Sequence, residues 1–134
     1  MRVAYTMIRV ADLDRSIGFY TQVLGMTLFR REDYPTGRFT LAFLGYGQET
    51  TGVTVELTWN WDITAYDRGN AWGHIAIAVD DVYAQCARLE ARGANLIRPA
   101  GPMAHLSPQR GGLGEIIAFL EDPDGYRIEL VPAH

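Results

Sequence analysis

Cysteine is almost missing from this sequence. Cys86 is the only one among 134 residues, so no disulfide can form within the chain. No apolar run approaches the roughly 18 residues that a transmembrane helix needs, and the first residues lack the hydrophobic segment of a signal peptide. We therefore expect a cytoplasmic protein with no membrane partner.

Runs of basic residues are missing as well. The formal net charge is -4, and no segment concentrates arginine. Binding the phosphates of nucleic acid or of an anionic membrane needs such a concentration, so we expect neither as a partner. What is present is ordinary for a soluble globular protein, with 48% hydrophobic and 21% charged residues. The length predicts one domain over residues 1–134.

A weak internal repeat divides the chain into two halves. Residues 5–13 align with residues 74–82 at an offset of 69 positions. Each segment runs into a helical pattern that ends at a glycine, Gly25 or Gly93, where a positive φ is wanted. The shared order predicts one βαβββ module in each half.

Hydrophobic periodicity gives the bounds of these modules, about residues 1–60 and 72–134. Each module is too small to bury both faces of its sheet, so we expect an α+β fold of paired modules, joined within one chain or between two. A loop over 99–114 is expected to be mobile. The expected strands cover 3–10, 26–32, 39–45, 52–59, 73–79, 95–98, 115–121 and 126–131, and the expected helices cover 14–23 and 81–92.

Polar side chains share one face of several expected strands. Because side chains alternate along a strand, Glu56, His74 and Glu129 lie opposite the apolar faces, and curved mixed sheets would gather them around a lined cavity. Two carboxylates and an imidazole suit a divalent metal. Each residue alone is more simply interpreted as a polar group on an exposed face. Repetition favours a site, because Tyr5 matches His74 and Glu56 matches Glu129.

Several stretches along nearly the whole chain carry a family resemblance. They include the turn Asp122-Pro123-Asp124-Gly125, which alone is typical of a wide superfamily. Together they resemble bacterial glyoxalase I, of the vicinal oxygen chelate superfamily, which implies the fold shared by glyoxalases, bleomycin-resistance proteins and dioxygenases. The stretches cover residues 6–10, 12–13, 15–17, 19–20, 23–26, 41–47, 56–61, 73–77 and 119–130.

The resemblance implies a lyase that converts the hemithioacetal of methylglyoxal and glutathione to S-lactoylglutathione. A proton moves through an enediolate with the help of a divalent metal, with nickel or cobalt favoured and zinc possible. Three metal ligands carry over as Glu56, His74 and Glu129, and Glu129 is also the expected base. Tyr5 stands at the fourth position, where the family has a histidine.

The same resemblance implies the remaining contacts of the substrate and the assembly. Arg9 and Asn60 fall where the family binds glutathione, and Arg9 would pair with a carboxylate of the tripeptide. The family forms its sites between two subunits, so we expect a homodimer with sites shared between the subunits.

Tyr5 leaves three interpretations open. It could bind the metal as a phenolate, pack beside a water that fills the position, or mark a site that has become poor in metal. Two alternative functions follow: a metal-poor binding or sequestering module, and a metalloenzyme of the superfamily with another substrate.

Overall fold

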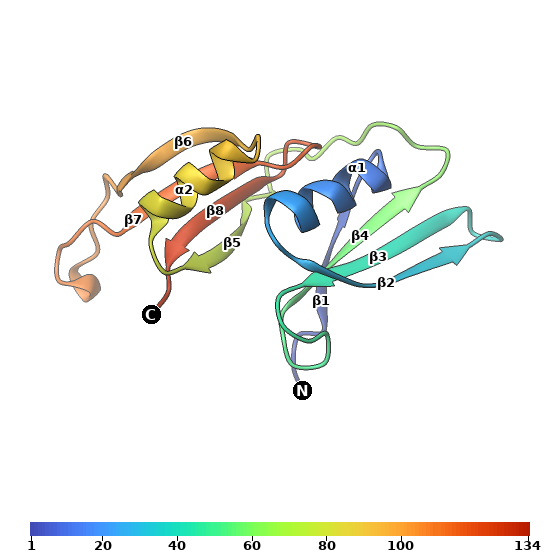
Figure 1. The fold of residues 1–134 in the computed structure, drawn as a ribbon, viewed down its shortest axis with the longest axis horizontal. Helices are drawn as coiled ribbons and strands as arrows, with labels where there is room; N and C mark the ends of the chain where they lie inside the picture. The colour runs from blue at the N-terminus through green and yellow to red at the C-terminus, as the bar shows by residue number, and fades with distance from the viewer. The chain divides into compact units, whose positions relative to one another are not determined.

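The computed structural model describes residues 1–134, which form two compact units, Met1–Gly69 and Asn70–His134. Each unit has the order βαβββ that the internal repeat predicts (Figure 1). The predicted fold class is therefore confirmed. Since the two units are separate bodies of contacts, each is described by itself.

The first unit has a four-stranded mixed sheet in the order β1-β4-β3-β2. The first strand, β1, pairs with β4 in parallel, and the other neighbours are antiparallel. A helical segment crosses from β1 to β2 and changes from α-helix to π-helix on the way. The elements are β1 (Tyr5–Arg9), α1 (Leu13–Gly18), η1 (Phe19–Val23), β2 (Thr27–Tyr34), β3 (Phe39–Gly45) and β4 (Thr54–Asn60).

The second unit repeats this topology in the order β5-β8-β7-β6, again with its first and last strands parallel. Its single helix and four strands agree with the predicted order, and a short 3-10 helix lies between β6 and β7. The elements are β5 (His74–Val79), α2 (Val82–Ala91), β6 (Asn95–Pro102), η2 (Pro108–Arg110), β7 (Ile116–Glu121) and β8 (Arg127–Pro132).

Both helices begin at an aspartate cap. The Asp12 carboxylate accepts a hydrogen bond from the backbone N–H of Arg15 at 3.0 Å, and Asp81 accepts one from Ala84 at 3.0 Å. At the other end of the first helical segment, Gly25 has a φ of 74°. A residue with a Cβ is strained at such a φ, so glycine stops the helix there.

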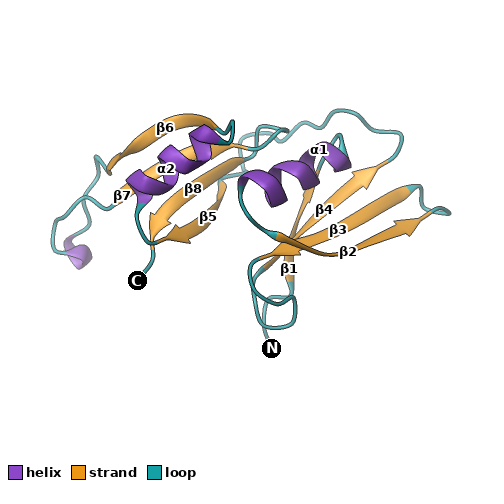
Figure 2. Cartoon of the chain, viewed as in Figure 1, coloured by secondary structure: helices purple, strands orange, loops and turns teal.

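Each helix covers one face of its own sheet (Figure 2). The covered face of the first unit is apolar: Val10, Leu44 and Leu57 are fully buried, and Tyr20 is buried from the helical side. Fully burying such a side chain contributes about 1.5–3 kcal/mol. The opposite face of each sheet, which we call the open face, carries the polar side chains.

One boundary of the second unit differs from the prediction. Strand β6 continues to Pro102, whereas the sequence predicts a loop from residue 99. Proline has no N–H that could donate to the neighbouring strand, and here the Arg98 guanidinium supplies hydrogen-bond donors instead. It donates to the carbonyls of Ile117 at 2.7 Å, Pro102 at 2.9 Å and Gly101 at 3.3 Å.

The turn between β7 and β8 is held by Asp122 and closed by Gly125. The Asp122 carboxylate accepts hydrogen bonds from the N–H groups of Asp124 at 2.9 Å and Tyr126 at 2.8 Å, and Gly125 has a φ of 83°. This turn fixes where β8 begins, and β8 carries Glu129.

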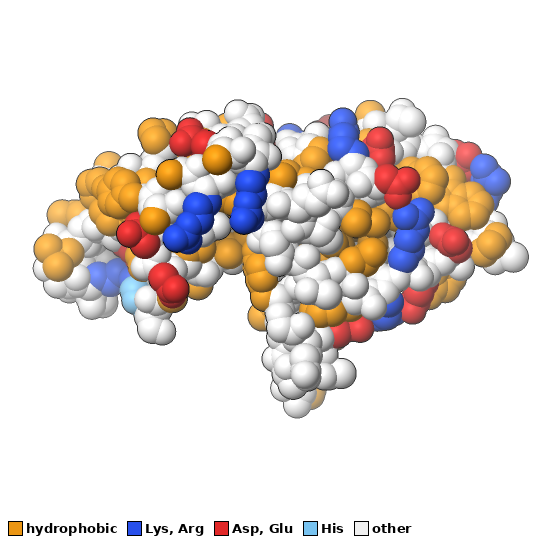
Figure 3. Space-filling view, in the orientation of Figure 1, with side chains coloured by type: hydrophobic (Ala, Val, Ile, Leu, Met, Phe, Trp, Pro, Cys, Tyr) orange, Lys and Arg blue, Asp and Glu red, His pale blue; other side chains and the backbone are white.

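Charged side chains of both signs are interspersed on one face of the molecule. Arginine and acidic side chains alternate on the face drawn in Figure 3, in keeping with the modest net charge. None of the helices has both the length and the apolar character needed to cross a bilayer.

Candidate functional site

A row of four side chains crosses the open face of the first unit. The strand register places Arg30 of β2 beside Phe43 of β3, Phe43 beside Glu56 of β4, and Glu56 beside Met7 of β1. Register partners point to the same face of a sheet. Tyr5 precedes Met7 by two positions and therefore points to this face as well.

The open face of the second unit carries the same row. Here the register places Arg98 beside Phe119, Phe119 beside Glu129, and Glu129 beside Ala76. His74 precedes Ala76 by two positions. In both units a register shift comes just before the arginine. The structure thus gives His74 and Tyr5 the same place in their units, and likewise Glu129 and Glu56.

His74 and Glu129 contact each other directly. The imidazole Nε2 lies 3.0 Å from a carboxylate oxygen of Glu129, whose side chain is 14% exposed. The imidazole also meets the Phe119 ring nearly edge-on, with 5.3 Å between centroids and 73° between planes. The contact with Phe119 fixes the orientation of the imidazole ring. The imidazole nitrogen of His74 and the carboxylate oxygen of Glu129, both atom types that bind metals, therefore lie next to each other.

Glu56 is buried without a partner. It is 7% exposed, and its carboxylate forms no hydrogen bond or ion pair. Burial raises the pKa of Glu56, and the positive charge of Arg30 acts in the opposite direction. Because burial disfavours the ionised carboxylate, a cation bound beside Glu56 would favour that form.

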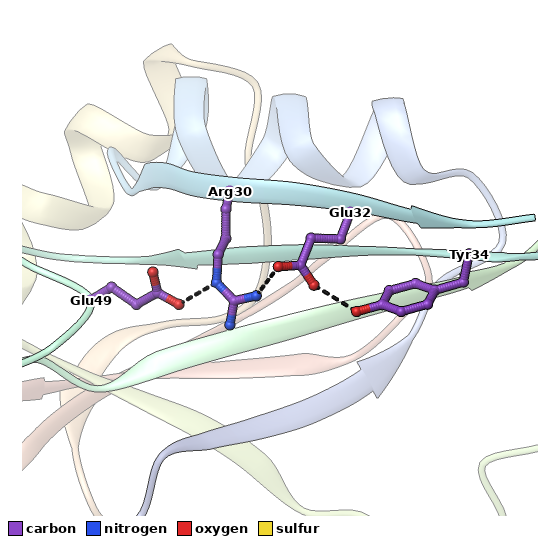
Figure 4. A network of polar contacts seen from close by, with 4 residues as sticks. All are labelled: Arg30, Glu32, Tyr34 and Glu49. Carbon is purple, nitrogen blue, oxygen red and sulfur yellow. Dashed lines mark hydrogen bonds and ion pairs between the residues drawn. The ribbon is translucent and has the colours of Figure 1, made fainter.

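A polar network lies along β2 on the first unit's open face (Figure 4). Arg30 Nε donates to Glu49 at 2.6 Å, its Nη1 pairs with Glu32, and the Tyr34 hydroxyl donates to Glu32 at 2.8 Å. The hydrogen bonds from Tyr34 and Arg30 hold the pKa of Glu32 below its usual value. The guanidinium carbon lies 3.6 Å from the centroid of the Phe43 ring.

Sequence reasoning missed this network and the two phenylalanines. Strand parity alone indicates which residues of one strand share a face, but not which strands are neighbours. The signal that could have found them is the repeat itself, because Arg30 and Phe43 recur as Arg98 and Phe119 on matching strands.

Tyr5 forms no hydrogen bond with Glu56, whereas His74 contacts Glu129 directly. Its ring crosses β4 to meet Phe43 of β3 edge-on, with 5.4 Å between centroids and 79° between planes. The Tyr5 side chain is otherwise open, with the residue 47% exposed.

Arg9 and Asn60, the two expected glutathione contacts, lie on the open face of the first unit. Arg9 follows Met7 by two positions, and Asn60 follows Glu56 by four, so both share the parity of the row. Arg9 is exposed, whereas the Asn60 amide donates to the Tyr66 hydroxyl at 3.0 Å. Their roles stay predictions.

The donor chemistry suits a divalent metal, although no group of three or more His, Cys, Asp or Glu side chains gathers within either unit. The second unit offers a nitrogen and an oxygen at contact distance, and the first offers a desolvated carboxylate. These are borderline and hard donors of the kind that bind nickel, cobalt and zinc.

Comparisons with known proteins cover nearly the whole chain. Residues 2–130 match the Glyoxalase/Bleomycin resistance protein/Dioxygenase superfamily. A lactoylglutathione lyase of Neisseria meningitidis is 55% identical over 131 residues, which are 98% of this chain and 90% of that protein.

Solved structures agree with this match. Glyoxalase I from Zea mays superposes with a TM-score of 0.89 at 42% identity, covering 98% of this chain and 44% of the maize chain. This chain therefore spans a little under half of the maize protein. A trypanothione-dependent glyoxalase I of Leishmania major superposes with a TM-score of 0.80 at 42% identity, covering 98% of this chain and 86% of that one. The chain belongs to the Glyoxalase/Bleomycin resistance protein/Dioxygenase superfamily and, within it, to the lactoylglutathione lyase (glyoxalase I) family of enzymes.

Proposed function

We propose that this enzyme converts the hemithioacetal of methylglyoxal and glutathione to S-lactoylglutathione. The observation that carries the proposal is the 3.0 Å contact between His74 and Glu129, together with the buried and unpaired Glu56 at the equivalent place of the other unit. Moving a proton between two adjacent carbons requires a carboxylate base close to a bound metal ion. Glu129 would be the base, and Glu56 and His74 would be ligands of the metal.

Glu56, His74 and Glu129 would hold a divalent metal, with nickel or cobalt favoured and zinc possible. When bound, this metal supplies positive charge beside the two substrate oxygens as the enediolate develops. His74 contributes more than a ligand atom, because its contacts with Glu129 and Phe119 hold the imidazole in one orientation.

Glu129 moves the proton. Its carboxylate takes the proton from C1 of the hemithioacetal, the electron pair forms the enediolate, and the same carboxyl returns the proton to C2. The thioester product has the composition of the substrate, so no oxidant or reductant is consumed. Phe119 of β7 lies beside Glu129 in the register.

Arg9 and Asn60 would bind the peptide part of the substrate. The Arg9 guanidinium suits a carboxylate of glutathione, and the Asn60 amide suits its peptide groups. The Leishmania relative is described as trypanothione-dependent, so the thiol carrier differs within the family. We favour glutathione because both expected contacts are present on one face.

We further propose that the enzyme works in the cytoplasm as a homodimer whose sites take residues from both subunits. One unit of each pair would supply Glu56 with Arg9 and Asn60, and the other His74 with Glu129. Cys86, the one cysteine, is buried at 5% exposure and suits a reduced compartment.

The test uses the whole chain stripped of metal with a chelator. Nickel, cobalt, zinc, manganese and iron(II) are added back singly, and thioester formation from methylglyoxal and glutathione is followed by absorbance. We expect activity with nickel or cobalt and none in the stripped protein. Folded protein that stays inactive with every metal would contradict the proposal.

A second candidate function is a metal-poor binding module, and Tyr5 at the fourth position is the observation that favours it. Such a module would bind the glutathione adduct without turning it over. Calorimetry of a stable S-substituted glutathione separates the two, because the binding module alone keeps its affinity when the metal is removed.

A further inference from the structure

We propose that a pocket on the helix-covered side of the first unit binds a small organic cation, an alkyl or quaternary ammonium group. The start of α1, the end of β4 and Arg31 of β2 surround this pocket (Figure 1). Its volume of about 330 Å³ is at the small end of the range for small-molecule sites. Trp59 in its wall follows Glu56 by three positions and points to the opposite face of the sheet. The inference therefore goes beyond the proposed function.

Two tryptophans form the aromatic wall of the pocket. The rings of Trp59 and Trp61 are 6.2 Å apart between centroids, with 41° between their planes. The Trp61 indole is fixed, because its N–H donates to the Thr40 hydroxyl at 2.8 Å and Thr40 is 1% exposed. Indole is the aromatic side chain that attracts a cation most strongly, within about 6 Å of the ring centroid. The wall thus offers two such rings at a set angle.

A cation of the protein already uses one of these rings. The Arg38 guanidinium lies over the Trp61 ring, 5.5 Å from its centroid. Two hydrogen bonds of 2.7 Å to Asp62 hold this guanidinium. Arg38 is not one of the residues that line the pocket, so the pocket side of the wall is left for a ligand.

The charge around the pocket favours a cation over an anion. Two carboxylates, Asp12 and Asp14, and one guanidinium, Arg31, line it. Arg31 Nη1 donates to Asp14 Oδ1 at 2.8 Å, so these two charges compensate each other. Asp12 remains, with Oδ1 accepting from the backbone N–H of Arg15. The balance is one negative charge, and a cation that leaves water for an apolar wall needs a counter-charge of this kind.

The second unit shows that the shared fold does not require these residues. Counted from the matching glutamates and arginines of the two rows, Pro132 takes the place of Trp59, and Pro99 takes that of Arg31. The same topology forms around these prolines. The indole and the guanidinium therefore belong to the first unit alone, as residues that contact a ligand would.

The experiment titrates the whole chain with choline and follows the indole N–H signals by nitrogen-15 NMR. The chain has three tryptophans, so three such signals are present. We expect saturable shifts for Trp59 and Trp61, and none for Trp72 of the second unit. The neutral isostere of choline, in which a tert-butyl group replaces trimethylammonium, has the same shape without the charge. We expect it to bind about tenfold more weakly.

Two variants separate the aromatic contribution from the electrostatic one. Trp59→Leu keeps an apolar side chain and removes one ring, so we expect the choline affinity to fall about tenfold. Asp14→Asn removes a partly solvated charge, so we expect a loss of about two- to fivefold for choline and none for the neutral isostere. Asp80→Asn, at an exposed aspartate of the second unit, is the matched control.

Several outcomes would overturn the inference. Choline that shifts no indole signal at millimolar concentration, or shifts Trp72 as much as the others, removes the site. Equal affinity for choline and its neutral isostere would make the pocket an apolar one with no preference for charge. Wild-type affinity in Trp59→Leu would place the cation elsewhere. The Trp61 indole signal reports that the first unit is folded in each variant, because its N–H is bonded to Thr40.

The isomerase assay decides the proposed function separately. Since the pocket is on the face opposite to Glu56, Asp14→Asn without choline should keep the kcat/KM of wild type. A protein that binds choline as expected but forms no thioester keeps this inference and loses the proposed function.

Discussion

The two units of this chain share a topology and a row of side chains, yet they use the row differently. In the second unit His74 and Glu129 touch, and Arg98 stabilises the backbone of the long strand β6. In the first unit Glu56 is buried alone, and Arg30 covers Phe43. A duplicated scaffold can therefore keep its strand register while the matching side chains of its two copies make different contacts.

The largest expected effect tests the assignment of the chemistry to the second unit. Glu129→Gln keeps the size of the side chain but removes the base, and general base catalysis contributes about 10²–10⁴-fold. We expect kcat to fall by that factor with nickel or cobalt present. The matched substitution Glu121→Gln, on the neighbouring strand, should leave kcat unchanged. Full turnover by Glu129→Gln would mean that another group moves the proton.

The difference between His74 and Tyr5 is tested by the same truncation at both places. His74→Ala removes a metal ligand and the partner of Glu129, so we expect metal affinity and kcat/KM to fall by about 10²-fold. Tyr5→Ala removes a packed ring and no ligand, so the metal affinity should stay within about tenfold of wild type. Equal losses from the two variants would contradict the asymmetry of the units.

The proposed substrate-binding role of Arg9 in the first unit predicts an effect on KM. Arg9→Ala removes a charge-assisted contact with a glutathione carboxylate, which is worth about 1.5–3 kcal/mol and hence about 10- to 100-fold in KM. Since the reacting carboxylate is elsewhere, kcat should change little. Arg2→Ala, an exposed arginine just before β1, is the matched control. An unchanged KM for Arg9→Ala would remove Arg9 from the binding site.

The buried carboxylate of the first unit predicts a pH dependence of the metal-free protein. Because burial raises the pKa of Glu56 above its unfolded value, its ionised form opposes folding. The free energy of unfolding should therefore increase as pH falls through the raised pKa toward the unfolded value.

Glu56→Gln should remove this dependence and stabilise the metal-free protein near neutral pH. Denaturant unfolding at several pH values measures both. Glu32 is the internal control, because its pKa is lowered and its contribution is lost as pH falls. A Glu56→Gln protein less stable than wild type at neutral pH would show that the carboxylate has an unrecognised partner.

The two arginines give the smallest expected effects. Arg98→Met removes three hydrogen bonds to backbone carbonyls, so we expect a loss of about 1–3 kcal/mol in the free energy of unfolding. Arg30→Met loses partly exposed ion pairs and should lower the melting temperature less. The reverse order would mean that the stack on Phe43 stabilises the first unit more than the backbone contacts stabilise the second.

The sequence predicted much of this architecture for physical reasons. The Asp12 cap and the Asp122 turn depend on contacts within a few residues, and so does the alternation of side chains along a strand. Such local features can be recognised in a sequence. The extension of β6 past Pro99 was not found, because it depends on a distant contact between Arg98 and Ile117. The stack of Arg30 on Phe43 depends on which strands are neighbours, and this information lies in tertiary structure.

The parallel pairing of the first and last strands in each unit has a consequence for folding. The strands β2, β3 and β4 follow one another as antiparallel neighbours, and so do β6, β7 and β8, so these ladders close short loops. Docking of β1 on β4 and of β5 on β8 closes a much longer loop, which costs more entropy and comes late. Since β5 carries His74 and β8 carries Glu129, their contact depends on this long-range pairing. A metal that binds the pair therefore stabilises the closed unit, and its loss first loosens an edge strand.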